Sequence, residues 1–319
     1  MPNQSLLDPK FLRKLEMLRI QARRAFPGTM RGERRSTRRG ASVEFADFRQ
    51  YQAGDDFRHV DWNIYARLER LMLRQFVEEE DVRIDILIDQ SKSMHYGTTA
   101  TKFDFARRTA ATLAFLGISS LDQVGVAMFD STLRGRLRAS RGRGHLMSIL
   151  NFLERHWKED NSPSPNPASE AAGEEKPLAF QPAERTNLKA VLKNYQKATS
   201  RSGILFVISD FFDDSDFRAE LRLLAQRKFD VNLIQALADE EMNPQVTGDW
   251  LMVDSESGEE REMTANDRTV TVYKRMLDDF TESLESFSRK SGIGYTLIQA
   301  SAAFEDVLLK RLMESRMAG

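Results

Sequence analysis

The sequence predicts an α/β protein built on a doubly wound, mainly parallel sheet. Short apolar runs typical of buried strands alternate with segments whose apolar residues recur at helical spacing. Strands that alternate with helices form parallel sheets with helices on both faces. The length of 319 residues allows one large domain of this Rossmann-like kind, preceded by an N-terminal helix and short β elements.

The first 80 residues are predicted to form an N-terminal part in three pieces. Asp8-Pro9 is typical of a helix start, and apolar residues follow at helical spacing until Pro27-Gly28, where this helix should end. Five arginines within Arg31–Arg39 indicate an exposed basic loop. Short strands and turns are expected within Val43–Val77.

Residues 81–319 are predicted to form the α/β domain. Its buried strands are expected at Ile84–Ile88, Val124–Phe129, Ile204–Ser209, Val231–Ala236 and Tyr295–Ile298. Its helices are expected at Phe103–Gly117, Gly144–Trp157, Asn187–Ala198, Phe217–Leu224, Tyr273–Phe287 and Phe304–Met313. Two insertions interrupt this order: a disordered one at residues 158–182, rich in Pro, Ser, Glu and Ala, and a hairpin at residues 250–263 that turns at Ser257-Gly258.

Composition excludes several classes of function. The chain has no cysteine, which excludes disulfides, thiolate metal sites and cysteine nucleophiles. The 47 basic and 48 acidic residues nearly cancel, so no overall field draws the protein to nucleic acid or to membranes. No signal pattern opens the chain, and no apolar run approaches the ~18 residues of a membrane span. We therefore expect a cytoplasmic protein.

Polar residues stand where the carboxyl ends of the predicted strands should lie, the edge at which parallel sheets bind ligands. Asp89, Ser91 and Ser93 follow the first buried strand, Thr186 precedes a helix, and Asp210 follows a later strand. Two carboxylates and three hydroxyls suit one hard divalent cation, with Mg²⁺ favoured over Mn²⁺ and Ca²⁺. Neutral hydroxyls would leave such an ion attractive to a partner's carboxylate. Alternatively, the aspartates only cap strand ends and the serines only form a turn.

The Asp-x-Ser-x-Ser motif, followed by Thr186 and Asp210, resembles the metal-ion-dependent adhesion site of von Willebrand factor A-type domains. The resemblance implies that Ser91, Ser93 and Thr186 coordinate the ion directly. It also implies that one or both of the aspartates act mostly through water. One difference is that glycine often follows the second aspartate in that family, whereas Phe211 follows it here.

A second resemblance covers the chain from about Gly40 to the C-terminus. It rests on Tyr51–Asp56 with Arg58, Asp61-Trp62 and Ala66-Arg67 upstream of the metal motif, and on Asp254–Glu259 in the predicted hairpin. These segments resemble the bacterial family called domain of unknown function 58, a branch of the von Willebrand A superfamily. The resemblance implies a partnership with MoxR-type AAA+ ATPases, as an adaptor in protein maturation or metal insertion.

We therefore expect a non-enzymatic, metal-dependent protein-recognition module that acts as adaptor or co-chaperone of such an ATPase. No histidine is placed as a base for Ser91 or Ser93, so no catalytic residue is expected. One alternative is a nucleic-acid-associated protein that binds phosphates with Arg31–Arg39, although no aromatic residue is interleaved there. Another is a metal-dependent hydrolase. The charges of Asp55–Arg74 are expected to pair and to dock the N-terminal part, with Trp62 as a packing anchor.

Overall fold

The computed structural model describes residues 44–52, 55–77, 82–98, 100–160, 186–199, 202–227, 229–254 and 258–302, together with residues 6, 9–11, 13, 14, 16 and 17. The chain divides into two compact units, one of residues 1–25 with 83–319 and one of residues 26–82. The predicted boundary after residue 80 is close to this division, but the N-terminal segment groups with the α/β unit. Leu6 and Phe11 are buried, and the Leu6 N–H donates to Glu154 Oε2 at 3.1 Å.

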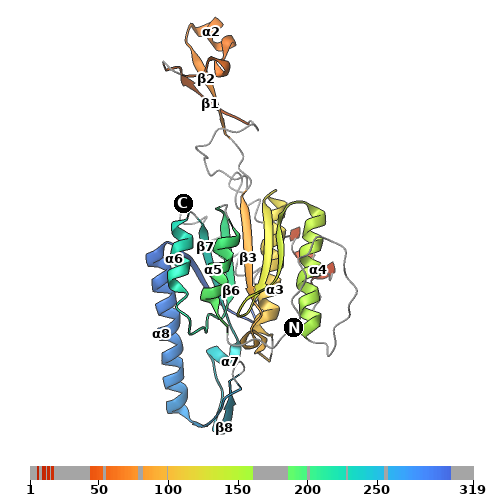
Figure 1. Cartoon of the computed structure of the whole chain (residues 1–319), viewed down its shortest axis with the longest axis vertical. Coiled ribbons are helices and arrows are strands. Elements are labelled where there is room, and N and C mark those ends of the chain that lie inside the picture. The colour runs from red at the N-terminus through yellow and green to blue at the C-terminus, as the bar shows by residue number, and fades with distance from the viewer. Residues whose placement is uncertain are drawn as a thin grey trace. The chain divides into compact units, whose positions relative to one another are not determined.

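The larger unit is built on a six-stranded sheet in the order β10-β7-β6-β3-β4-β5 (Figure 1). Its strands are β3 (Arg83–Asp89), β4 (Gln123–Phe129), β5 (Leu133–Ser140), β6 (Ile204–Ser209), β7 (Asp230–Leu237) and β10 (Gly294–Gln299). All neighbours pair in parallel except β4 and β5. The predicted α/β class and the five apolar strands are confirmed. The edge strand β5 escaped prediction because arginines, not an apolar run, alternate along it.

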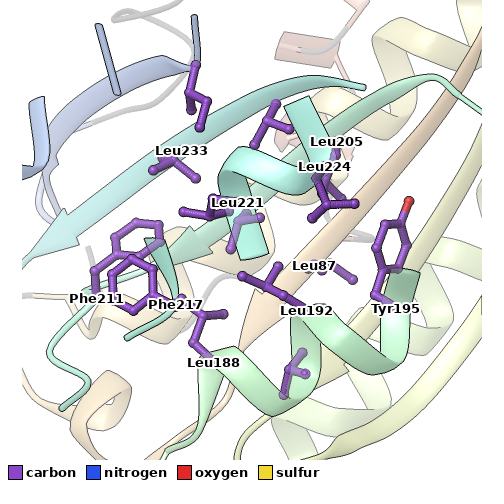
Figure 2. Close-up of a cluster of buried hydrophobic side chains, with 14 of the residues drawn as sticks. Leu87, Leu188, Leu192, Tyr195, Leu205, Phe211, Phe217, Leu221, Leu224 and Leu233 are labelled. Carbon is purple, nitrogen blue, oxygen red and sulfur yellow. The ribbon is translucent and has the colours of Figure 1, made fainter. Parts of the chain in front are cut away.

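Helices cover both faces of this sheet. The face that carries Leu87 packs against α5 (Leu188–Ala198) and α6 (Arg218–Gln226), as the buried cluster in Figure 2 shows. Leu284 and Phe287 of α8 (Asp267–Ser291) belong to the same cluster. Side chains of a strand alternate between its two faces, so Ile86 and Ile88 point the other way and are also fully buried. There α3 (Lys102–Ser119) lies against β3 and β4 and packs on α4 (Arg143–Asp160). The sheet is therefore doubly wound, as predicted.

Several predicted boundaries differ from the observed ones or lie outside the described residues. The helix α4 continues to Asp160, so residues 158–160 of the predicted disordered insertion are helical. The rest of that insertion, the Arg31–Arg39 loop and the closing helix Phe304–Met313 lie outside the described residues. The helix α8 ends at Gly292 as predicted, where φ is 67°. Among the described helices, none has the length and apolarity required to cross a membrane.

The predicted hairpin insertion is confirmed as β8 (Gly248–Val253) paired antiparallel with β9 (Glu260–Ala265). It forms a sheet of its own and does not pair with the main one. Gly258 has φ of 73°, a left-handed conformation that favours glycine and agrees with the predicted turn.

The smaller unit contains the antiparallel strands β1 (Glu44–Gln50) and β2 (Met72–Val77), the short helix η1 (Phe57–His59) and α2 (Trp62–Leu68). Its charges pair as expected, with Arg49 on Asp55 at 2.6 Å and Arg58 on Asp56 at 3.1 Å. The docking of this segment onto the main sheet stays a prediction. Trp62 is 59 % exposed and α2 buries none of its residues, so Trp62 anchors no packing within this unit, and its role in docking stays a prediction as well.

Candidate metal site

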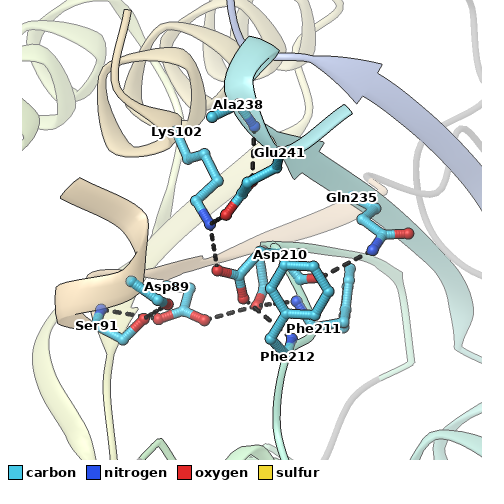
Figure 3. Close-up of polar contacts among 11 residues, drawn as sticks. Asp89, Ser91, Lys102, Asp210, Phe211, Phe212, Gln235, Ala238 and Glu241 are labelled. Atoms are coloured by element: carbon cyan, nitrogen blue, oxygen red, sulfur yellow. Dashed lines mark hydrogen bonds and ion pairs between the residues drawn. The ribbon is translucent and has the colours of Figure 1, made fainter. Parts of the chain in front are cut away.

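The candidate site forms at the carboxyl edge of the two central strands. β3 and β6 pair in parallel, with Ile88 opposite Ile208, so their last residues lie side by side. Asp89 closes β3, and Ser209 closes β6 directly before Asp210. Figure 3 shows the two aspartates facing each other across this edge. The strand register therefore brings together carboxylates that are 121 positions apart by residue number.

Asp89 is an almost fully buried carboxylate with two donors. Its Oδ1 accepts from the Ser91 backbone N–H at 2.9 Å, and its Oδ2 accepts from the Ser209 hydroxyl at 2.6 Å. Burial, followed by the negative charge of Asp210, raises the pKa of Asp89 from 3.8 to about 7. Two hydrogen bonds are thus too few to offset the loss of water around this charge.

The two serines of the motif lie next to each other. Ser91 directly precedes η2 (Lys92–His95), and its Oγ is 3.0 Å from Ser93 Oγ. Ser91 is buried and Ser93 is half-buried, whereas Lys92 between them is exposed. The alternate residues of the motif therefore turn their hydroxyls to one side, as a shared ligand would require.

Asp210 is bound by a buried lysine that sequence reasoning missed. Lys102 Nζ donates to Asp210 Oδ2 at 2.7 Å and to Glu241 Oε1 at 2.6 Å, where Glu241 belongs to the short helix α7 (Asp239–Met242) (Figure 3). Burial by itself lowers the pKa of Lys102. The charges of Asp210 and Glu241 outweigh burial and raise this pKa above its ordinary value, so the amine is an ammonium ion.

A signal for Lys102 was present in the sequence. It stands four residues before Ala106, so it continues the apolar stripe of α3 at helical spacing. A cation on the buried stripe of a helix needs an anionic partner, because an unpaired buried charge is costly. The sequence did not reveal which carboxylates would supply it.

The backbone conformation of the residue after Asp210 is one that favours glycine, the residue often found at this position in von Willebrand factor A-type domains. Phe211 has φ of 61°, in the left-handed region that costs a residue with a side chain about 1–2 kcal/mol. Its ring is fully buried in the cluster of Figure 2, and its N–H donates to Ser209 Oγ at 2.9 Å. Burial of the ring offsets the backbone strain, so this position keeps the conformation without glycine.

Thr186 directly precedes Asn187, the residue that caps α5. It is half-buried. The start of α5 is bonded to the loop that follows Asp210, since the Leu188 N–H donates to Asp213 Oδ2 at 2.5 Å. Thr186 thus lies just before a helix that this loop holds in place, and its membership of the ligand set stays a prediction.

The charges of the site suit a divalent cation. Asp89, Asp210 and Glu241 together carry three negative charges when ionised, and Lys102 supplies one positive charge. Within the described part of the chain, no three acidic or histidine side chains gather as a metal-binding group. An ion here would therefore depend on the hydroxyls of Ser91 and Ser93 as well as on the carboxylates. Oxygen donors, with carboxylates that outnumber the single ammonium ion, fit Mg²⁺.

Comparison with known proteins identifies a family and relatives that are similar in sequence. The family model described as "Protein of unknown function DUF58" matches residues 47–279. The uncharacterized proteins Rv1480 of Mycobacterium tuberculosis (strain ATCC 25618 / H37Rv) and Mb1516 of Mycobacterium bovis are each 25 % identical over 277 residues. The matches cover 86 % of this chain and 78 % of each relative.

Two solved structures are also similar. One is the conserved hypothetical protein BatB from Bacteroides thetaiotaomicron, at a TM-score of 0.41 and 12 % identity. The other is an aerotolerance-related membrane protein from Bacteroides fragilis, at a TM-score of 0.40 and 14 % identity. Each match covers 75 % of this chain and all of the other chain.

Proposed function

Because this chain belongs to the DUF58 family of proteins of unknown function, and carboxylates outnumber cations at the carboxyl edge of its sheet, we propose that it is a metal-dependent protein-recognition module. One divalent cation, Mg²⁺ in the first place, would be held by Ser91, Ser93 and Thr186, with Asp89 and Asp210 behind them. The observation that carries the proposal is that the carboxylates of Asp89, Asp210 and Glu241 outnumber the single ammonium ion of Lys102.

The chain's own groups prepare the site in two ways. The Ser91 N–H and the Ser209 hydroxyl orient the Asp89 carboxylate, while Lys102 and the Phe212 N–H orient that of Asp210. Lys102 is shared between Asp210 and Glu241, and Asp89 has hydroxyl and N–H donors but no cation among the described residues that bond to it, which leaves the site attractive to a cation. When bound, the ion would supply an electrophilic position for a carboxylate of a partner protein.

The identity of the partner is proposed from the family resemblance rather than from geometry. The resemblance implies an association with MoxR-type AAA+ ATPases, so we propose such an ATPase, or its client, as the partner. The protein would then act as an adaptor and not as an enzyme. Recognition through the ion requires only an accessible carboxylate on the partner, so the site itself is compatible with either protein.

Calorimetric titration with Mg²⁺ and Mn²⁺ tests the metal part of the proposal. We expect one site in the wild type, none in Asp89→Ala and an unchanged site in Lys92→Ala, the matched control, because Lys92 is exposed within the same motif. Ser93→Ala should weaken binding more mildly, since water can replace one hydroxyl on the ion. Failure of the wild type to bind either ion would refute the metal site and leave Lys102 as its only cation.

A pull-down of a MoxR-type ATPase tests the partner. Binding should occur with Mg²⁺ and disappear with excess EDTA or in Asp89→Ala, while circular dichroism shows an intact fold. The fold should survive because the core cluster consists of apolar side chains and not of metal ligands. Equal binding with Mg²⁺ and with EDTA would reject the metal bridge.

A further inference from the structure

The β8–β9 hairpin displays an apolar strand to solvent. Trp250, Leu251, Met252 and Val253 are consecutive in β8, and each is 47–57 % exposed. A strand that packs one face normally alternates apolar and polar residues, and a run of four exposed apolar residues is avoided unless it has a function. Both faces of β8 are apolar, so packing one of them on this unit would still leave the other in water.

The outer edge of β8 is also open. β8 pairs only with β9, and no other described strand adds to this two-stranded sheet. Edge strands that stay monomeric are commonly protected by charged side chains or proline, because an unprotected apolar edge pairs with other strands. The last four residues of β8, Trp250–Val253, have neither, and the one charge of the strand is Asp249 near its start. The free edge of β8 therefore has the properties of an edge to which another strand can pair.

The surroundings of the hairpin are strongly acidic. Residues 239–267 contain ten acidic residues and one basic residue, Arg261, although the whole chain is nearly neutral. Arg261 is itself paired with Glu259 at 3.3 Å. Directly opposite residues share a face of an antiparallel pair, so Glu262 lies beside Leu251 and Glu260 beside Val253. This charge favours a cationic partner and disfavours nucleic acid or an anionic membrane.

The hairpin lies at the same end of the unit as the candidate metal site. It follows α7, whose Glu241 binds Lys102 and whose Glu240 accepts from the Thr98 N–H at 3.0 Å. Figure 1 shows α7 and β8 together at the lower end of the α/β unit. The start of α8 continues the exposed apolar surface with Val272, Tyr273 and Met276. Burial, followed by the charges of Glu241 and Tyr96, raises the pKa of Tyr273 to about 12, which agrees with this proximity.

We propose that β8 is a docking strand for an extended segment of a partner protein that is apolar at its centre and flanked by lysine or arginine. The segment adds to the free edge of β8 as a further strand. Main-chain hydrogen bonds supply affinity, and alternate side chains on the two faces supply specificity. The segment lies on the other side of β8 from β9, so its long cationic side chains reach over the face of β8 toward Glu260 and Glu262 of β9. This contact does not involve the ion, so it stands independently of the metal site.

Binding of a synthetic peptide tests the proposal. The measurement is made in the presence of EDTA, which removes any divalent ion, so peptide binding does not depend on the metal site. The probe is a fluorescein-labelled peptide with an apolar core of valine and leucine between two lysine pairs. Its controls carry glutamate pairs at the ends or a central proline, which cannot complete the ladder. Fluorescence anisotropy should show binding of the lysine peptide at least about tenfold tighter than of either control.

Protein variants locate the site of binding. Leu251→Lys combined with Val253→Lys places cations on the edge and should weaken binding of the lysine peptide at least about tenfold. The matched control is Leu223→Lys on α6, which changes another exposed leucine outside the hairpin and should bind as the wild type does. Glu260→Lys with Glu262→Lys should reverse the preference towards the glutamate peptide. All of these positions are exposed, so circular dichroism should show an unchanged fold.

Several results would overturn the proposal. They are absence of binding, equal binding of the lysine and glutamate peptides, undiminished binding of the proline peptide, and binding that is insensitive to the hairpin variants. A wild-type dimer that becomes monomeric in Leu251→Lys would instead assign the hairpin to a second copy of this chain. Hairpin-dependent binding to phosphatidylglycerol vesicles would assign it to a membrane surface.

Discussion

Replacing Asp89 by asparagine should stabilise the metal-free protein at neutral and alkaline pH. In the wild type, burial and the neighbouring charge of Asp210 raise the pKa of Asp89 from 3.8 to about 7. This displacement corresponds to a cost of about 4 kcal/mol when the carboxylate must be ionised in the folded state. Asparagine removes the charge but presents an N–H group to the Ser209 hydroxyl, which we expect to cost about 1–2 kcal/mol. A net gain of roughly 2 kcal/mol in the free energy of unfolding should remain.

The same pKa fixes the direction of the pH dependence. Between about pH 4 and pH 7 the folded state keeps the Asp89 proton that the unfolded chain has released. The stability contributed by this group is therefore fully present below pH 4, is lost as the pH rises through this window, and is constant above it. The asparagine variant should lack this component. Bound Mg²⁺ should remove it as well, because the ion compensates the ionised carboxylate.

Urea unfolding followed by circular dichroism measures these effects at pH 5 and pH 8, with EDTA and with Mg²⁺. Asp130→Asn is the control, because Asp130 is also buried but is paired with Arg134 at 2.5 Å and should lose stability when neutralised. Lower stability of Asp89→Asn than of the wild type at pH 8 in EDTA would refute the reasoning. So would stabilisation by Mg²⁺ that is equal in the two proteins.

Three further substitutions test other features by urea unfolding. Lys102→Met should destabilise the metal-free protein by about 3–5 kcal/mol, because Asp210 and Glu241 lose their shared cation, and an intact stability would show that the ion pairs are not formed. Tyr195→Phe removes the buried hydroxyl that donates to Asp85 Oδ2 at 2.7 Å, and should lower the free energy of unfolding by about 1–2 kcal/mol. An unchanged stability would indicate that water replaces this hydrogen bond. Gly292→Ala should lower the free energy of unfolding by about 1 kcal/mol, because Gly292 has φ of 67° and alanine is strained in this conformation. No atom lies within contact of the added methyl group, so the strain is the whole effect, and an unchanged stability would contradict the left-handed conformation.

The order of the elements was predictable because their signals are local. Ile84–Ile88 is an apolar run of strand length, and the stripe that begins at Phe103 has helical spacing, so each element can be read without its neighbours. Strands that alternate with helices then allow few arrangements other than a parallel sheet. The edge strand β5 was missed for the same reason, because arginines occupy the positions at which an apolar signal would stand.

The motif residues Asp89, Ser91 and Ser93 were predictable because five consecutive residues after a buried strand contain them all. Only the tertiary structure decided the electrostatics of the site. Lys102 meets Asp210 across 108 residues and Glu241 across 139, and no local pattern encodes such a pairing. The raised pKa of Asp89 likewise depends on burial and on a charge from another strand, and both exist only after the sheet has formed. Sequence determines which groups are present, whereas packing determines which charges share a space without water.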